Sequence, residues 1–385
     1  MSTAGPHGAP PVPARTTRHT LRTWLLVGMG GAVLAVCAVV LTVAIGISTG
    51  VQAGLIGLAF AVLPLGVVVP AFLWLDRFEA EPRRLLVFAF VWGAVVASAV
   101  ALVLNTSSIS VLVQVSGNRA EAMTVGAVTI APVVEESLKG LAVLLLLLFR
   151  RREMDGVVDG MVYAGIAAAG FAFAENILYL GRAFHEMGGQ GLVAVFILRG
   201  VMAPFAHPLF TICTGIGVGI AATTRSSLVR VAAPVLGWVC AVLLHGLWNL
   251  TSIVGAQGYF GIYLVLQVPV FLAFVVLAIW MRHREGRIIG LHLLPYVDAG
   301  WLTPAEAHML SSMGERRRAR HWARGRGGRR SVRAMEGFQD VGSELALLRS
   351  RMVRGIAAPT AQQTEREMLD TMVTRRAQFL TGAGA

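Results

Sequence analysis

The feature that most constrains this chain is a succession of long apolar stretches separated by short connectors. A hydrocarbon core of about 30 Å requires roughly 20 residues of α-helix to cross it. Stretches of about that length lie at 23–48, 52–75, 85–106, 126–149, 157–181, 191–221, 231–254 and 258–281. The sequence therefore predicts an all-α membrane protein, built as a bundle of about eight transmembrane helices.

The distribution of charge agrees with a multi-pass membrane protein. The chain is 56% apolar and has a net charge of +12, but its arginines gather in a few connectors and in the C-terminal region. Connectors that are rich in arginine alternate with connectors that hold only Arg119 and Arg182 between them. Since basic loops stay on the cytoplasmic side, both chain ends should be cytoplasmic in a protein of the cell membrane. Topology thus explains the basic charge, and no nucleic-acid partner is predicted.

Composition divides the chain into three regions. Residues 1–22, rich in Pro, Ala, Gly and Thr, are predicted to be a disordered cytoplasmic N-terminus. Residues 23–281 should form the transmembrane domain, and residues 282–385 a basic cytosolic tail that is partly helical or disordered.

Polar and ionisable residues inside the apolar stretches are the candidates for function, because each costs free energy in the membrane unless it is paired or faces a wet cavity. They are Glu135, Glu136, Lys139, Glu175, Asn176, Arg199, His207, His245 and Asn249. Lys139 is the only lysine of the chain, so composition alone does not explain it.

Helical spacing brings several of these groups to one level of the bilayer. Glu135 and Lys139 are four residues apart, as are His245 and Asn249, so each pair shares a helix face. Glu135, Glu175 and His245 fall at similar depth in the outer half, and His207 joins them if its helix begins later than its apolar stretch.

Two histidines and a carboxylate can hold a divalent metal with one position open for water, and another carboxylate can accept the proton of that water. This is the chemistry of metal-assisted amide hydrolysis. Glu135 and Glu136 are adjacent and point about 100° apart on a helix, so one of them should orient a neighbour. The spacing leaves open which of the two is the base.

Two other functions use the same residue types. In a membrane scaffold or binding protein, Glu135 and Lys139 would be an internal ion pair, and Arg199 would neutralise Glu175. A transporter also uses buried carboxylates, but the sequence shows neither paired interrupted helices nor internal symmetry. The coincidence of several such groups at one depth favours an active site.

Five motifs occur in order along the membrane region. They are Asp76-Arg-Phe-Glu-Ala-Glu81-Pro82, the Glu-Glu-x-x-Lys motif at 135–139, the stretch from Asp159 through Phe171 to Glu175 and Asn176, the His207-Pro208 pair, and His245-x-x-x-Asn249. With these motifs, residues 60–280 resemble the PrsW family of intramembrane proteases, and more distantly the CAAX-processing and bacteriocin-processing membrane proteases.

The resemblance implies a glutamate-dependent, zinc-dependent endopeptidase that cleaves membrane-associated proteins within the lipid bilayer, with anti-sigma factors among the substrates. It implies catalytic roles for Glu135, Glu136 and Lys139, and for Asn249 as a donor to the oxyanion. It implies that Glu175, His207 and His245 surround the metal, with Asn176 and Arg199 supporting them.

Overall fold

The computed structural model describes residues 17–251, 253 and 255–381, and these residues form helices without a strand. Six of the described helical segments are long and apolar enough to cross a membrane: Gly28–Thr49, Val51–Leu75, Arg83–Ser116, Val157–Thr223, Ser227–Thr251 and Gly258–Asp298. The prediction of an all-α polytopic bundle is confirmed, while the count of eight spans stays a prediction. Of the predicted disordered N-terminus, residues 1–16 lie outside the described residues and 17–22 belong to the first helix.

The first part of the bundle consists of four helical segments joined by short turns. They are α1 (Thr17–Thr49), α2 (Val51–Leu75), α3 (Arg83–Val91) with η1 (Trp92–Ala97) and α4 (Ser98–Ser116), and α5 (Arg119–Val125) with η2 (Gly126–Ile130) and α6 (Ala131–Phe149). The segments η1 and η2 are π-helical turns inside longer helices, a feature often found near functional sites.

The centre of the bundle is α7 (Val157–Phe196), which packs against α2, α3 and α8. Glycines permit these close contacts, because a Cβ atom at Gly170 would lie 2.1 Å from the carbonyl oxygen of Phe90, and one at Gly160 would lie 2.1 Å from that of Gly215. The first half of α7 is therefore almost completely buried.

The chain reverses direction inside α7 and then breaks again. Gly188 has a φ of 63°, a conformation that suits glycine, and from there the chain returns so that Leu192 packs against Leu180. It continues through η4 (Ile197–Met202), and α8 (Ala206–Thr223) starts after an interruption at 203–205. The predicted span at 191–221 is thus broken in two, and His207 lies in the first turn of α8.

The last part of the bundle is α9 (Ser227–Thr251), α10 (Gly255–Ile262), η5 (Tyr263–Gln267) and α11 (Val268–Asp298). Helix α9 packs against α8 and α6, whereas α11 continues past the predicted domain boundary at 281/282 without interruption.

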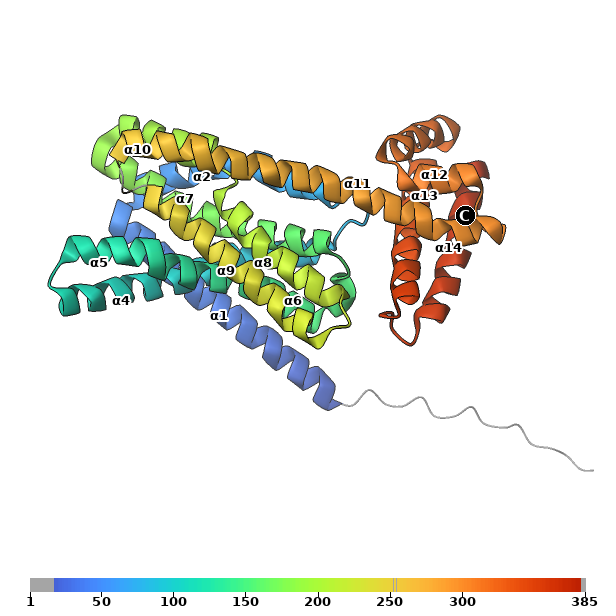
Figure 1. Cartoon of the computed structure of the whole chain (residues 1–385), viewed down its shortest axis with the longest axis horizontal. Coiled ribbons are helices and arrows are strands. Elements are labelled where there is room, and N and C mark those ends of the chain that lie inside the picture. Colours follow the sequence, from blue (N-terminus) through green and yellow to red (C-terminus); the bar gives the residue numbers. More distant parts are fainter. Residues whose placement is uncertain (1–16, 252, 254, 382–385) are drawn as a thin grey trace, which may run out of the picture.

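The tail is folded into helices around a core of its own. Helices α12 (Pro304–Ser311), α13 (Met313–Arg354) and α14 (Ala361–Thr381) pack with the end of α11, and Leu310, Phe338 and Leu345 are buried among them. Figure 1 shows these helices gathered at one end of the bundle, and the first described turns of α1 point toward the same end. This is the tail side of the molecule.

A buried arginine joins the tail to the membrane domain. Arg316 of α13 is 1% exposed, and its guanidinium donates to the carbonyl oxygen of Phe78 at 3.2 Å. It also donates to the carbonyl oxygen of Gln339 and to Oγ of Ser343 within the tail. Burial lowers the pKa of Arg316 to about 10, so the side chain remains charged at neutral pH. The loop that follows α2 is thereby fixed to the tail.

Candidate active site

Four helices bring the predicted site residues together at one level. Glu135, Glu136 and Lys139 come from α6, Glu175 from α7, His207 from α8 and His245 from α9. At 1.5 Å per residue, these positions lie about 15 to 27 Å along their helices from the tail-side ends. The layer lies in the half of the bundle that is farther from the tail.

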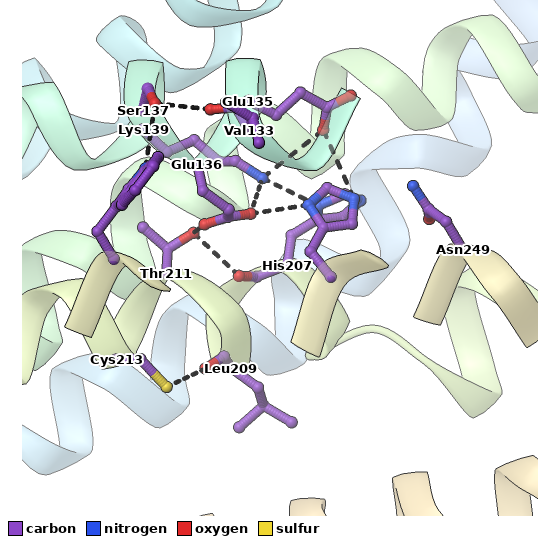
Figure 2. Close-up of polar contacts among 12 residues, drawn as sticks. Val133, Glu135, Glu136, Ser137, Lys139, His207, Leu209, Thr211, Cys213 and Asn249 are labelled. Atoms are coloured by element: carbon purple, nitrogen blue, oxygen red, sulfur yellow. Dashed lines mark hydrogen bonds and ion pairs between the residues drawn. The ribbon is translucent and has the colours of Figure 1, made fainter. Parts of the chain in front are cut away.

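Glu136 is the centre of a buried network, which Figure 2 shows. Its Oε1 atom lies 2.6 Å from Nζ of Lys139 and 2.9 Å from Nδ1 of His245. Its Oε2 atom accepts a hydrogen bond from Oγ1 of Thr211 at 2.7 Å. Because both carboxylate oxygens are engaged, Glu136 can hold Lys139 and His245 in position.

Lys139 is completely buried between the two glutamates and a histidine. Its Nζ atom lies 3.2 Å from Nδ1 of His207 and 3.7 Å from Oε2 of Glu135, and it faces the ring of Phe171 at 4.4 Å from the centroid. A lysine fits here because its ammonium is a compact charge with three donors at the end of a flexible stem.

Glu135 differs from Glu136 because it has a free oxygen. Its Oε1 atom accepts a hydrogen bond from Nδ2 of Asn105 at 3.2 Å. Its Oε2 atom is buried and makes no hydrogen bond within the described part of the chain, although it lies 3.8 Å from Nε2 of His245. Burying a carboxylate oxygen without a hydrogen bond costs free energy. Such an atom is typical of a site where the missing partner is a ligand or a reacting group.

Glu135, His207 and His245 each offer one ligand atom, and these three atoms lie within 4.8 Å of one another. In the described residues this is the one group of three or more His, Cys, Asp or Glu side chains that could hold a metal ion. A carboxylate and two imidazoles are a donor set that suits zinc. The residues present therefore fit a metal ion, and the unbonded oxygen of Glu135 could contact that ion or a water beside it.

Glu175, predicted as a metal ligand, contacts one of the histidines directly. Its Oε2 atom lies 2.8 Å from Nε2 of His207 and 2.5 Å from Nη2 of Arg199. Arg199 donates from Nε to Oδ1 of Asn176 at 2.8 Å. Arg199 and Asn176 thus lie beside Glu175, and the roles of all three residues stay predictions.

Asn249 lies at the edge of the site, apart from the buried network in Figure 2. Its side-chain amide donates to the carbonyl oxygen of Ala127 at 2.8 Å, which fastens α9 to η2. This bond uses one of the two N–H groups of the amide, and the predicted role in binding an oxyanion stays a prediction.

A cavity of about 430 Å³ opens beside these residues, and Glu135, Glu175, Arg199 and His207 form part of its polar wall. Its apolar wall contains side chains from the first, fourth and seventh helices: Leu41, Ala101, Leu102, Ile109, Phe171 and Leu178. The site is therefore accessible from a space that is large enough for part of a peptide segment.

Sequence reasoning missed two residues that hold the glutamates. Thr211 donates to Glu136, and Asn105 donates to Glu135. Thr211 lies four residues after His207 and so shares its helix face, which is a signal that the sequence contained. Asn105 is a lone amide at the end of an apolar stretch, and its partner lies 30 residues away in the chain.

Comparison with known proteins agrees with this geometry. Residues 81–277 match the sequence model of the PrsW family intramembrane metalloproteases. The protease PrsW of Oceanobacillus iheyensis is 34% identical over 107 residues, which are 28% of this chain. The chain spans 45% of the length of that relative. No solved structure matches the chain.

The family match covers more than half of the chain and includes every residue of the buried network, from Glu135 to His245. The chain belongs to the PrsW family of intramembrane metalloproteases.

Proposed function

We propose that this protein is an endopeptidase that hydrolyses peptide bonds of proteins embedded in the membrane. The observation that carries the proposal is the unbonded, buried Oε2 atom of Glu135, which lies in one group with His207 and His245 beside a cavity of about 430 Å³. Membership of the family supports a metal at this group, and we infer that the metal is zinc because the donors are imidazoles and carboxylate.

The two adjacent glutamates have different roles in this proposal. Glu135 acts at the reacting water, because it has a free oxygen and lines the cavity. Glu136 does not, since its oxygens are bonded to Lys139, His245 and Thr211. We assign Glu136 the task of positioning His245 and of neutralising Lys139.

When bound, zinc would polarise the scissile carbonyl and lower the pKa of its water. His207 and His245 would hold the ion, with Glu135 or Glu175 as the carboxylate ligand. If Glu175 is the ligand, Glu135 would accept the proton of the water; if Glu135 is the ligand, Glu175, which also lines the cavity, would accept it. In both arrangements Glu135 is required for cleavage, and the metal content of the glutamate variants distinguishes them.

The surroundings of the site favour membrane segments as substrates. The apolar wall of the cavity suits the apolar side chains of a substrate segment that enters from the membrane. A helical substrate must first unwind, because the carbonyl groups of a helix are hydrogen-bonded within the segment. Cleavage should therefore fall where a substrate helix is weak or has ended. Anti-sigma factors are the substrate class that the family resemblance suggests.

We further propose that the protein lies in the cell membrane with both ends in the cytoplasm. The arginine-rich tail and the first described turns of α1 lie toward the same end of the bundle in Figure 1. Basic segments remain on the cytoplasmic side, so the active site would lie in the outer half of the bilayer.

The test combines metal content and cleavage of a membrane-protein substrate for three purified variants, Glu135→Gln, Glu175→Gln and His245→Ala. All three should lose cleavage, and His245→Ala should also lose zinc. If one of the two glutamate variants also loses zinc, the glutamate substituted in that variant is the carboxylate ligand of the metal. Glu121→Gln serves as the control because Glu121 is exposed and lies outside the site. Full cleavage by Glu135→Gln, or equal zinc content in the wild type and His245→Ala, would overturn the proposal.

A further inference from the structure

A second cavity lies on the tail side of the bundle, between the transmembrane helices and the tail. It has a volume of about 580 Å³ and shares no lining residue with the cavity beside Glu135. Its walls come from the start of α7, the end of α8, the middle of α11 and the end of α13. The family match ends at residue 277, so most of the α11 wall and all of the α13 wall lie beyond it.

Two arginines from different helices line this cavity, and neither forms an ion pair with a carboxylate of the described residues. The guanidinium of Arg284 on α11 faces the ring of Trp280, 5.7 Å from the centroid, and Arg354 on α13 donates to the carbonyl oxygen of Ser350 at 3.3 Å. Both arginines line the same cavity, and burial and then the charge of Arg284 lower the pKa of Arg354. Two guanidinium groups on the wall of one cavity are suited to binding a phosphate.

A carboxylate in the same cavity also has an unused oxygen. Glu285 lines the cavity, and its Oε2 atom is buried without a hydrogen bond to any described residue. Asp159 is already engaged, because its Oδ2 atom accepts from the backbone N–H groups of Asp155 and Gly156, both at 2.7 Å. Glu285 can therefore accept a hydrogen bond from a cationic group of a ligand whose phosphate binds the two arginines.

The rest of the cavity wall is apolar and comes from membrane-spanning helices. Ile216 and Ile220 of α8 and Leu277 of α11 line it, and Trp280 stands half exposed one turn before Arg284. Tryptophan followed by arginine at the end of an apolar helix is typical of the boundary between hydrocarbon and headgroups. A ligand at this position can reach the bilayer with its apolar part and the tail with its polar part.

We propose that this cavity binds an aminophospholipid from the leaflet on the tail side of the membrane. The phosphodiester lies between Arg284 and Arg354, the ammonium group lies on Glu285, and an acyl chain follows the apolar wall. Such a lipid contacts α11 and α13 at once and so connects the membrane domain with the tail. This inference is independent of the proposed protease activity.

The experiment measures lipid that stays bound to the full chain, by native mass spectrometry after purification and exchange into mixed micelles. The micelles contain equal amounts of phosphatidylethanolamine and phosphatidylglycerol. The wild type should retain phosphatidylethanolamine in preference. In Arg284→Gln/Arg354→Gln, retention should fall about tenfold. Glu285→Gln should still retain phospholipid but should lose the preference for the amine.

The matched control is Arg287→Gln/Arg333→Gln, which removes the same charge from the same two helices at exposed positions outside the cavity. It should retain lipid as the wild type does. Equal retention by the cavity variant and the control, or equal retention of the two lipids by the wild type, would overturn the proposal.

A competition measurement on the wild type keeps the proposal testable should the variants fail to fold. Glycerophosphoethanolamine has the same headgroup without acyl chains, and it should not displace the lipid at equal concentration. Displacement would show that the cavity binds a soluble phosphodiester and not a lipid. Inorganic phosphate is tested in the same way and should likewise leave the lipid bound.

Discussion

Nδ1 of His245 lies 2.9 Å from Oε1 of Glu136, and both side chains are buried. A proton on Nδ1 is donated to this carboxylate, which leaves the lone pair of Nε2 on the side of Glu135. Glu136 thus selects the tautomer in which His245 can bind a metal, although it need not touch the metal itself.

Glu136→Gln should weaken metal binding by about 10 to 100-fold, because residues that orient a metal-binding histidine contribute this much. The measurement is the competition of the protein with a chelator of known affinity. Thr211→Val removes the hydrogen bonds of the Thr211 hydroxyl to Oε2 of Glu136 and to the carbonyl oxygen of His207, leaves the Glu136 carboxylate in place, and should have a smaller effect. Unchanged affinity in Glu136→Gln would contradict the positioning role.

Lys139→Met should lower the free energy of unfolding by about 3 to 5 kcal/mol, because it leaves the charge of Glu136 buried without its cation. Thermal unfolding in detergent is the measurement. The double variant Lys139→Met/Glu136→Gln removes the uncompensated charge of Glu136 and should unfold at a higher temperature than Lys139→Met. Lys139→Arg should not restore stability, since the buried site is shaped for an ammonium group. A double variant less stable than Lys139→Met would show that the ion pair is not the cause.

Arg316→Met should release the tail from the loop that follows α2. The variant loses the hydrogen bonds to the carbonyl oxygens of Phe78 and Gln339. The Gln339 oxygen still accepts from Oγ of Ser343, whereas the Phe78 oxygen loses its donor, at a cost of about 1 to 3 kcal/mol. Limited proteolysis should then cleave the tail faster. Arg317→Met changes the next residue, which is exposed, and should leave the cleavage rate unchanged. Equal rates in the two variants would contradict the role of Arg316.

Stability should decrease as the pH rises from 6 to 9. Burial raises the pKa of Asp76 to about 8 and that of Glu81 to about 10. In the unfolded chain both carboxyl groups release their protons near pH 4, so the folded state binds more protons throughout this interval. The stabilisation is complete below pH 4 and is lost as the pH rises through the folded-state pKa values, by at most about 1.4 kcal/mol per pH unit for each group.

Thermal unfolding between pH 6 and 9 checks this prediction, and Glu81→Gln should reduce the slope. Glutamine keeps an oxygen that can accept the hydrogen bond from the hydroxyl of Tyr163, which lies 2.5 Å from Oε2 of Glu81. An equal slope in the variant and the wild type would exclude Glu81 as a source of the pH dependence.

The sequence was sufficient to predict the helices and the layer of polar groups. Apolar length determines where a helix can cross a membrane, and the connectors then determine which ends lie on the same side. These two constraints place Glu135, Glu175 and His245 at similar depth, and the structure shows that their helices are neighbours in the bundle.

The interruptions of the helices were not predicted, because a hydropathy pattern does not show where the chain turns back within an apolar stretch. Gly188 reverses the chain and the interruption at 203–205 divides the next span. Pro204 was a signal for the second interruption, since the residue before a proline disfavours helical geometry. The folded tail was underestimated for a related reason: Leu310, Phe338 and Leu345 form a core only after helices distant in the chain meet.

The interruption before Ala206 has an electrostatic consequence. The aligned peptide dipoles of a helix that starts in the middle of the bundle give that end a partial positive charge. Helix α8 directs this end into the layer that contains Glu175 and His207. Its field favours negative charge on Glu175, and a backbone dipole has no proton to lose. This part of the electrostatic environment therefore stays constant whatever the pH outside the membrane.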